Sequence, residues 1–193
     1  MWLKRNMLND LIWAYVTYWL LALVGITWGY HRYFAHKEIS SKRDWVEVVM
    51  LFCGNLCGLT SPLTWVGVHR MHHAEADSYK DPHSPLHHSW WTIIFTTWRI
   101  KSIPRKYIKD VIKNPRIMFF HRHGLKVWAA TAMATLFHSP TLFLFVCVGP
   151  VILGRLGFGL LNYFGHKNGK PIDRPWLNII APLEGNHAKH HEV

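Results

Sequence analysis

Charged residues are scarce in this sequence, and acidic residues are scarcer than basic ones. Only 17% of the 193 residues are charged, whereas 50% are hydrophobic. This balance is too apolar for a disordered chain and more apolar than most soluble domains, so it favours a membrane protein. The 22 Lys and Arg outnumber the 11 Asp and Glu, which gives a formal net charge of +11. We therefore expect the protein to face an anionic surface such as lipid headgroups.

Several kinds of site are also missing. The three cysteines, Cys53, Cys57 and Cys147, lie in apolar stretches and form no CxxC pair, which argues against a disulfide framework. The motifs GxGxxG, GxxxxGK[ST], HExxH and GxSxG do not occur, so nucleotide-binding, zincin and serine-hydrolase chemistry has no support. Nucleic acid is not expected as a partner, because the basic residues lie between apolar runs, where the positive-inside rule explains them.

Three apolar runs predict an all-α integral membrane helical bundle, with residues 1–193 forming one domain. Residues 11–30 carry no charge, and this run is as long as a membrane-spanning helix. Residues 48–68 contain Gly54, Gly58 and Pro62, so this run could span the membrane or form a broken, re-entrant or interfacial helix. Residues 127–165 are too long for one straight helix and are interrupted by Ser139-Pro140, which predicts a turn between two helices.

Histidine is unusually abundant, with 15 residues, and most of it falls in clusters. Two clusters share the pattern HxxHH, whose positions i, i+3 and i+4 lie on one helix face and direct three imidazoles to a common point. In a third cluster, His31 and His36 are about 140° apart on an ideal helix, so His36 lies beyond the helix end or after a distortion. The clusters and the associated Asn/His pair are His31 and His36; His69, His72 and His73; His187, His190 and His191; Asn162 and His166.

Nine clustered histidines exceed the needs of one metal ion, so we expect two ions. Neutral imidazole suits Fe, Zn, Cu and Ni, and the ligands alone do not choose among them. All ligands must lie on one side of the membrane, so residues 48–68 should not span it and residues 127–165 should cross it twice. No role is expected for His121, His123 or His138, and a loop or headgroup role is expected for His83, His87 and His88.

The order HxxxxH, HRxHH, NxxxH and HxxHH resembles the membrane fatty-acyl desaturase family. Further matches are Gly29-Tyr30-His31-Arg32, Trp65 four residues before the second box, and Asp81-Pro82-His83-Ser84-Pro85 after it. The second box is most similar to Δ9-type acyl-lipid desaturases of bacteria and cyanobacteria, although an acyl-CoA substrate stays open. The resemblance implies a di-iron centre that uses O₂ to remove two hydrogens from a fatty acyl chain, with electrons from ferredoxin or cytochrome b5.

The resemblance also implies two ligand sets. One iron would take His31, His36, His69, His73 and His191. The other would take His72, His166, His187 and His190, with Asn162 reaching it through water. The substrate, a membrane lipid or an acyl thioester, should enter an apolar tunnel lined by Trp65, Gly58 and Gly67. The site should face the cytoplasm, where the basic segments 32–43 and 99–126 would also lie.

Four alternatives stay open at this point. A hydroxylase could use the same di-iron site, because the position of the substrate carbon decides between the two reactions. A histidine-lined metal transporter would need ligands spread along a path at membrane depth. A haem-binding membrane protein would need only two of the histidines. The chain could also be a truncated, inactive relative.

Overall fold

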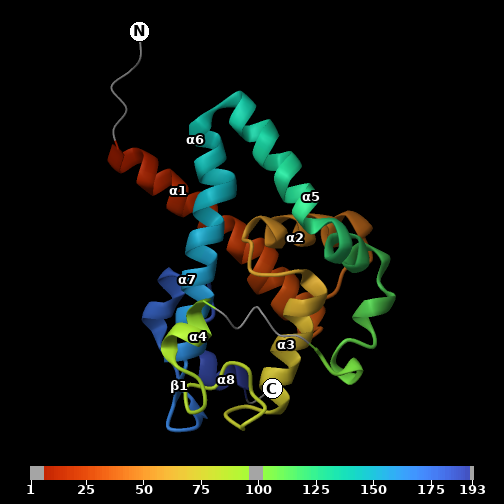
Figure 1. The fold of residues 1–193 in the computed structure, drawn as a ribbon, viewed down its shortest axis with the longest axis vertical. Helices are drawn as coiled ribbons and strands as arrows, with labels where there is room; N and C mark the ends of the chain where they lie inside the picture. Colours follow the sequence, from red (N-terminus) through yellow and green to blue (C-terminus); the bar gives the residue numbers. More distant parts are fainter. Residues whose placement is uncertain (1–6, 96–101, 192–193) are drawn as a thin grey trace.

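The computed structural model describes residues 7–95 and 102–191, and helices form most of this part of the chain (Figure 1). The all-α prediction is therefore confirmed in its coarse form. A short antiparallel hairpin pairs His166 with Pro171 and Lys167 with Lys170. The elements are α1 (Met7–Ala22), η1 (Leu23–Ala35), α2 (Asp44–Leu56), α3 (Pro62–Ala74), α4 (Trp90–Phe95), η3 (Arg105–Tyr107), η4 (Val111–Lys113), α5 (Pro115–His138), α6 (Pro140–Phe143), η5 (Leu144–Val148), α7 (Gly149–Phe164), β1 (His166–Lys167), β2 (Lys170–Pro171), η6 (Pro175–Ile179) and α8 (His187–His191).

The first helix confirms the helical prediction for residues 11–30. It runs without a break from Met7 to Ala35, 29 residues that are apolar and long enough to cross a membrane. Its second part, η1, is a π-helix and packs on α2. The backbones of the two helices touch, since a Cβ on Gly25 would overlap the backbone nitrogen of Gly54. Glycine at this crossing therefore permits the close packing that fixes η1 beside α2.

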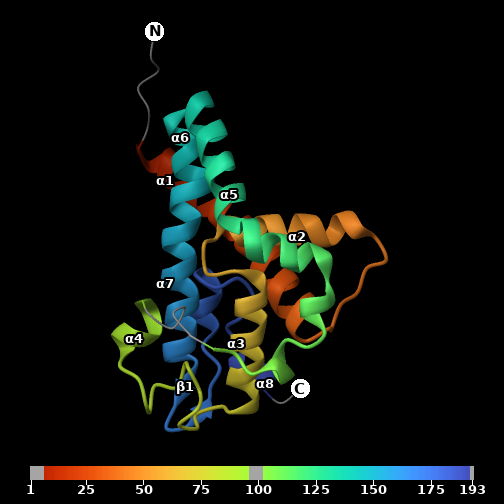
Figure 2. The ribbon, with the colours of Figure 1, turned by 45° about the vertical axis from the view of Figure 1, so that its right-hand side comes forward.

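The apolar run 48–68 is broken into two helices, which is one of the expected alternatives. α2 and α3 have 13 residues each, which gives about 20 Å and falls short of the ~30 Å hydrocarbon layer. Gly58 in the turn has a φ of 61°, a left-handed conformation that glycine adopts readily. Ser61 then caps α3 by accepting a hydrogen bond from the backbone of Thr64. Figure 2 shows α2 lying across the direction of α7, whereas α3 runs toward the end that carries α8.

The predicted turn at Ser139-Pro140 is also confirmed. α5 begins after Asn114, whose side chain accepts hydrogen bonds from the next backbone amides, and it ends at His138. Ser139 is extended, and Pro140 begins the next helical segment. In both ribbon views α5 and α7 come together at the end that carries α6 (Figures 1 and 2). The segment Pro140–Phe164 is the second stretch that is long and apolar enough to span a membrane.

The segment after β2 is tied to the first helix by hydrogen bonds from side chains to carbonyls. Tyr18 donates to the Ile180 carbonyl, and Thr27 donates to the Pro182 carbonyl over 2.7 Å. Both donors are fully buried. These bonds between distant parts of the sequence hold the chain just before α8 against η1, which brings the last histidine cluster to the first.

Candidate metal centre

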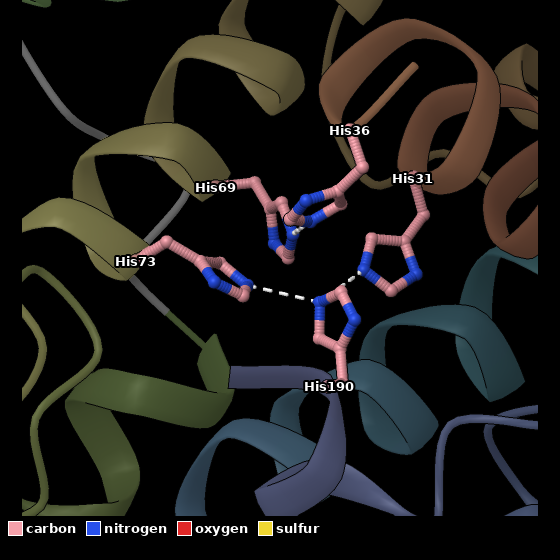
Figure 3. Close-up of side chains that lie close together, drawn as sticks. All are labelled: His31, His36, His69, His73 and His190. Atoms are coloured by element: carbon pink, nitrogen blue, oxygen red, sulfur yellow. Dashed lines mark hydrogen bonds between the residues drawn. The ribbon is translucent and has the colours of Figure 1, made fainter. Parts of the chain in front are cut away.

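The clustered histidines meet in two adjacent groups at the end of the molecule where α3, β1 and α8 come together. Within each group the possible ligand atoms lie within 4.8 Å of one another. Figure 3 shows the first group, to which η1, α3 and α8 contribute together with the residue that follows η1. The first group is His31, His36, His69, His73 and His190, and the second group is His72, His166, His187 and His191.

The π-helix explains how His31 and His36 reach the same group. The backbone amide of His36 donates to the carbonyl of His31 over 3.0 Å, the i to i+5 bond of a π-helix. Residues five apart therefore fall near one another on the helix surface, and the two ring centroids lie 4.9 Å apart. Both expected alternatives apply: His36 is the residue that follows η1, and the distortion before it is a change of helix type that covers all of η1.

Each HxxHH cluster is divided between the two groups, which corrects the expectation of a common point. On a helix, position i+4 is rotated by about 40° from position i, whereas i+3 is rotated by about 60° in the opposite direction. On α3, His69 and His73 face the first group while His72 faces the second. On α8, His187 and His191 face the second group while His190 faces the first. The expected ligand sets thus had His190 and His191 interchanged, because His190 is the i+3 residue and faces the first group.

The ring nitrogens are arranged in a consistent way. In the first group, the Nε2 atom of His190 lies 2.7 Å from that of His31 and 3.0 Å from that of His73. In the second group, the Nε2 atom of His187 lies 3.0 Å from that of His166 and 3.2 Å from that of His191. Such convergence of acceptor atoms is what a shared metal ion requires.

Three carboxylates form hydrogen bonds with the Nδ1 atoms of three of these histidines. The Nδ1 atoms of His31, His72 and His166 each lie 2.8 Å from an oxygen of Glu184, Asp81 and Asp77, respectively. Each carboxylate accepts a hydrogen bond from Nδ1–H and leaves Nε2 free to bind a metal, the usual arrangement around ligating histidines. The Nε2 of His72 is buried and has no hydrogen-bond partner among the described residues. These donor atoms therefore fit two metal ions.

Burial also keeps these rings in the form that binds metal. Burial is the main cause of the low pKa of His36, about 4, and neighbouring imidazoles add to the effect. The pKa of His191 is likewise lowered to about 4, mainly by burial. Burial places the pKa of His69, His72 and His187 well below the usual value. These five rings are therefore neutral at pH 7, with a lone pair available for a metal.

The role of the three carboxylates was not predicted, and His83 was expected to have only a loop or headgroup role. The structure buries His83 to 4% exposure and places its ring 5.4 Å from that of His72. The backbone amide of His83 donates to Asp81, the same carboxylate that holds His72. The available signal was the segment from Asp81 to Pro85, which has one of the few acids of the chain next to a histidine.

Arg70, inside the second box, is a further residue that the sequence analysis did not single out. Its guanidinium donates to the carbonyls of Phe34 and Ala35 at the end of η1 and to that of Tyr107. It also forms two bonds to the carboxylate of Asp110, at 2.6 and 3.1 Å, and these hydrogen bonds hold the pKa of Asp110 well below its usual range. Arg70 thus fixes the end of the first box against the second.

A narrow cavity lies beside the histidines, with about 30 Å³ open to water-sized molecules. Trp65 lines it and stacks on His69 with ring centroids 4.8 Å apart, and Asn162 lines it from α7. The structure does not bring Gly58 or Gly67 to this cavity. Gly58 lines a second cavity of about 430 Å³. A Cβ on Gly67 would meet the side chains of Ile103 and Ile108, outside both cavities as far as the described residues show.

Comparison with known proteins confirms the resemblance that the motifs predicted, although no family model matches the chain. An sn-1 stearoyl-lipid 9-desaturase of Anabaena variabilis is 27% identical over 92% of this chain and 70% of the relative. One from Synechocystis sp. is 35% identical over 92% of this chain and 59% of the relative. The chloroplastic palmitoyl-monogalactosyldiacylglycerol delta-7 desaturase of Arabidopsis thaliana is 38% identical over 92% of this chain and 52% of the relative. The chain thus spans between about half and 70% of these relatives' length.

Proposed function

We propose that this chain, a homologue of the acyl-lipid desaturases of cyanobacteria and plants, introduces a double bond into a fatty acyl chain at a di-iron centre. The observation that carries the proposal is the pair of histidine groups, which gather nine imidazoles beside a narrow cavity. The acyl chain would belong to a lipid or a thioester. O₂ would be the second substrate, and ferredoxin or a cytochrome b5-type protein would supply electrons.

The histidines would act as the ligands, and the carboxylates would orient them. His31, His36, His69, His73 and His190 would hold one iron, and His72, His166, His187 and His191 the other. Asn162 lines the same cavity as His187 and would reach the second ion through a water. Bound iron supplies the redox chemistry with O₂ that breaks unactivated C–H bonds. Glu184, Asp81 and Asp77 keep each ring in the tautomer that presents Nε2.

The cavity would hold the acyl chain in one position. Trp65, Phe158 and Leu161 supply apolar walls next to the histidines. A flexible chain reacts at a single carbon only when it is held fixed close to the reacting groups. The small space also keeps bulk water away from the reacting carbon.

The arrangement also supports a membrane topology with the site on the cytoplasmic side. Both candidate spans, Met7–Ala35 and Pro140–Phe164, end next to histidines of the site, so they would cross in the same direction. The chain must then return between them, and α5 would be the returning helix. Basic residues are frequent in segments 32–43 and 99–126, which would lie in the cytoplasm, although residues 99–101 lie outside the described part of the chain.

The function is tested by expressing the full chain in a host that makes no unsaturated fatty acids and analysing total lipids by gas chromatography and mass spectrometry. We expect a monounsaturated acyl chain to appear, with a matching decrease in its saturated precursor. The variant His31→Ala, which removes a ligand, should give no product. Hydroxylated chains would assign the site to a hydroxylase, and a wild-type protein that binds iron but changes no lipid in the presence of an electron donor would contradict the proposal.

A further inference from the structure

One charged residue, Arg155, interrupts the apolar segment Pro140–Phe164. Its Nε donates to the carbonyl of Gly58 over 3.1 Å. No carboxylate pairs with its guanidinium in the part of the chain that the structure describes, and the residue is exposed. A cation in a membrane segment is costly without a partner, so such residues usually mark a ligand or an ion path. Arg155 plays no part in the metal centre.

Arg155 borders the cavity of about 430 Å³, whose lining residues come from α5, α7, the end of α2 and the turn that joins α2 to α3. The indole nitrogen of Trp128, also in the wall, is buried and lacks a hydrogen-bond partner among the described residues. An indole N–H can only donate, and so can a guanidinium. Among the described lining residues Arg155 carries the only charge, and a guanidinium that can only donate fits a ligand with an anionic oxygen.

The Arg155 cavity adjoins the histidine cavity, because Thr60 lines both. On α7, Val151 and Arg155 line the Arg155 cavity, and Phe158 and Asn162 line the histidine cavity. Their spacing of four, three and four residues places all of them on one stripe of the helix. Arg155 and Asn162 are separated by seven residues, about 10.5 Å along the axis and roughly the length of an extended chain of eight carbon–carbon bonds.

We infer that the Arg155 cavity binds the polar end of the acyl substrate, with the guanidinium paired to an oxyanion. The acyl chain then passes Thr60 and reaches the histidine cavity with its middle carbons. The oxyanion is the phosphate of a phospholipid or the carboxylate of a free fatty acid. This inference rests on the proposed function, and it adds a residue that selects the substrate and sets the distance from the polar end to the reacting carbon.

Binding is measured by native mass spectrometry of the purified, metal-loaded chain with distearoylphosphatidylglycerol, stearate or distearoylglycerol. The wild type should retain one or both anionic probes in preference to the neutral one, and the preferred anion identifies the source of the oxyanion. Arg155→Gln should lower retention of that anion by about tenfold or more, with metal content unchanged. Arg155→Lys should restore part of it. Arg122→Gln, which removes an exposed charge on α5 outside the cavity, should have no effect.

The orientation of the chain is tested with stearoyl probes that carry a photoreactive diazirine at carbon 9 or at the methyl end. The carbon 9 probe should label the histidine cavity, at Thr64 or Trp65, and the methyl-end probe should not label Leu125 or Trp128. Methyl-end labelling of those two residues, or anion retention unchanged by Arg155→Gln, would overturn the inference while the desaturase proposal stands. Failure of the wild type to desaturate any lipid or to label the histidine cavity would instead remove the proposed function.

Discussion

Replacing His72 by alanine is expected to abolish desaturation and to remove one metal ion while the other stays bound. His72 has its Nε2 in the second group, and its ring is 1% exposed, so no solvent or neighbouring side chain replaces it easily. His190→Ala should abolish activity as well, but by emptying the first group, where its Nε2 lies between those of His31 and His73. Metal analysis of each purified variant and lipid analysis of the expressing cells measure both effects.

The control for these variants is His138→Ala. His138 is exposed at the end of α5, in the turn that joins it to α6, so its loss should change neither activity nor metal content. His121 is not a suitable control, since its Nδ1 lies 2.7 Å from the hydroxyl of Ser61 and it lines the Arg155 cavity. Equal losses in His72→Ala, His190→Ala and His138→Ala would mean that the two groups have no special role.

Asp81→Asn is expected to lower metal affinity by roughly 10-fold to 100-fold without removing a ligand. Asp81 is fully buried, and one of its oxygens accepts from both His72 Nδ1 and the backbone amide of His83. Its other oxygen accepts from the backbone amide of Asp77. An asparagine in this position keeps the shape but turns one acceptor into an NH₂ group that faces a donor.

Metal retention during titration with a chelator measures the effect of Asp81→Asn. Asp44→Asn serves as the matched control, because Asp44 is 77% exposed and pairs with Arg116 on the surface. Metal affinity equal to that of the wild type in Asp81→Asn would contradict the role of this carboxylate in orienting His72. A loss of affinity in both variants would point to a general effect on folding.

The candidate ligands were predictable from sequence because metal binding imposes a spacing on each helix separately. The pattern HxxHH marked the residues, but the division of each cluster between two groups, with His69 and His73 in one and His72 in the other, appears only in the structure. The exchange of His190 and His191 was not predictable, since it depends on how α8 is turned toward α3. The hydrogen bonds that place α8, such as that from Thr27 to Pro182, join residues 155 positions apart.

Glu184 and the cavity walls were beyond the reach of sequence patterns for the same reason. Glu184 is 153 positions away from His31, and nothing in the local sequence links the two. Gly67 follows Trp65 closely in the sequence, but its helix face is covered by Ile103 and Ile108 from another segment. Gly58 is explained by the turn before α3, which needs a positive φ.

The most direct test of the account is the number of metal ions bound by the full chain after purification from iron-supplemented cells. Metal and protein are quantified in the same sample, and the visible spectrum is recorded for haem. Two histidine groups with separate sets of Nε2 atoms predict close to two iron ions per chain and no haem absorbance. A stoichiometry near one, or a haem spectrum, would contradict the dinuclear centre.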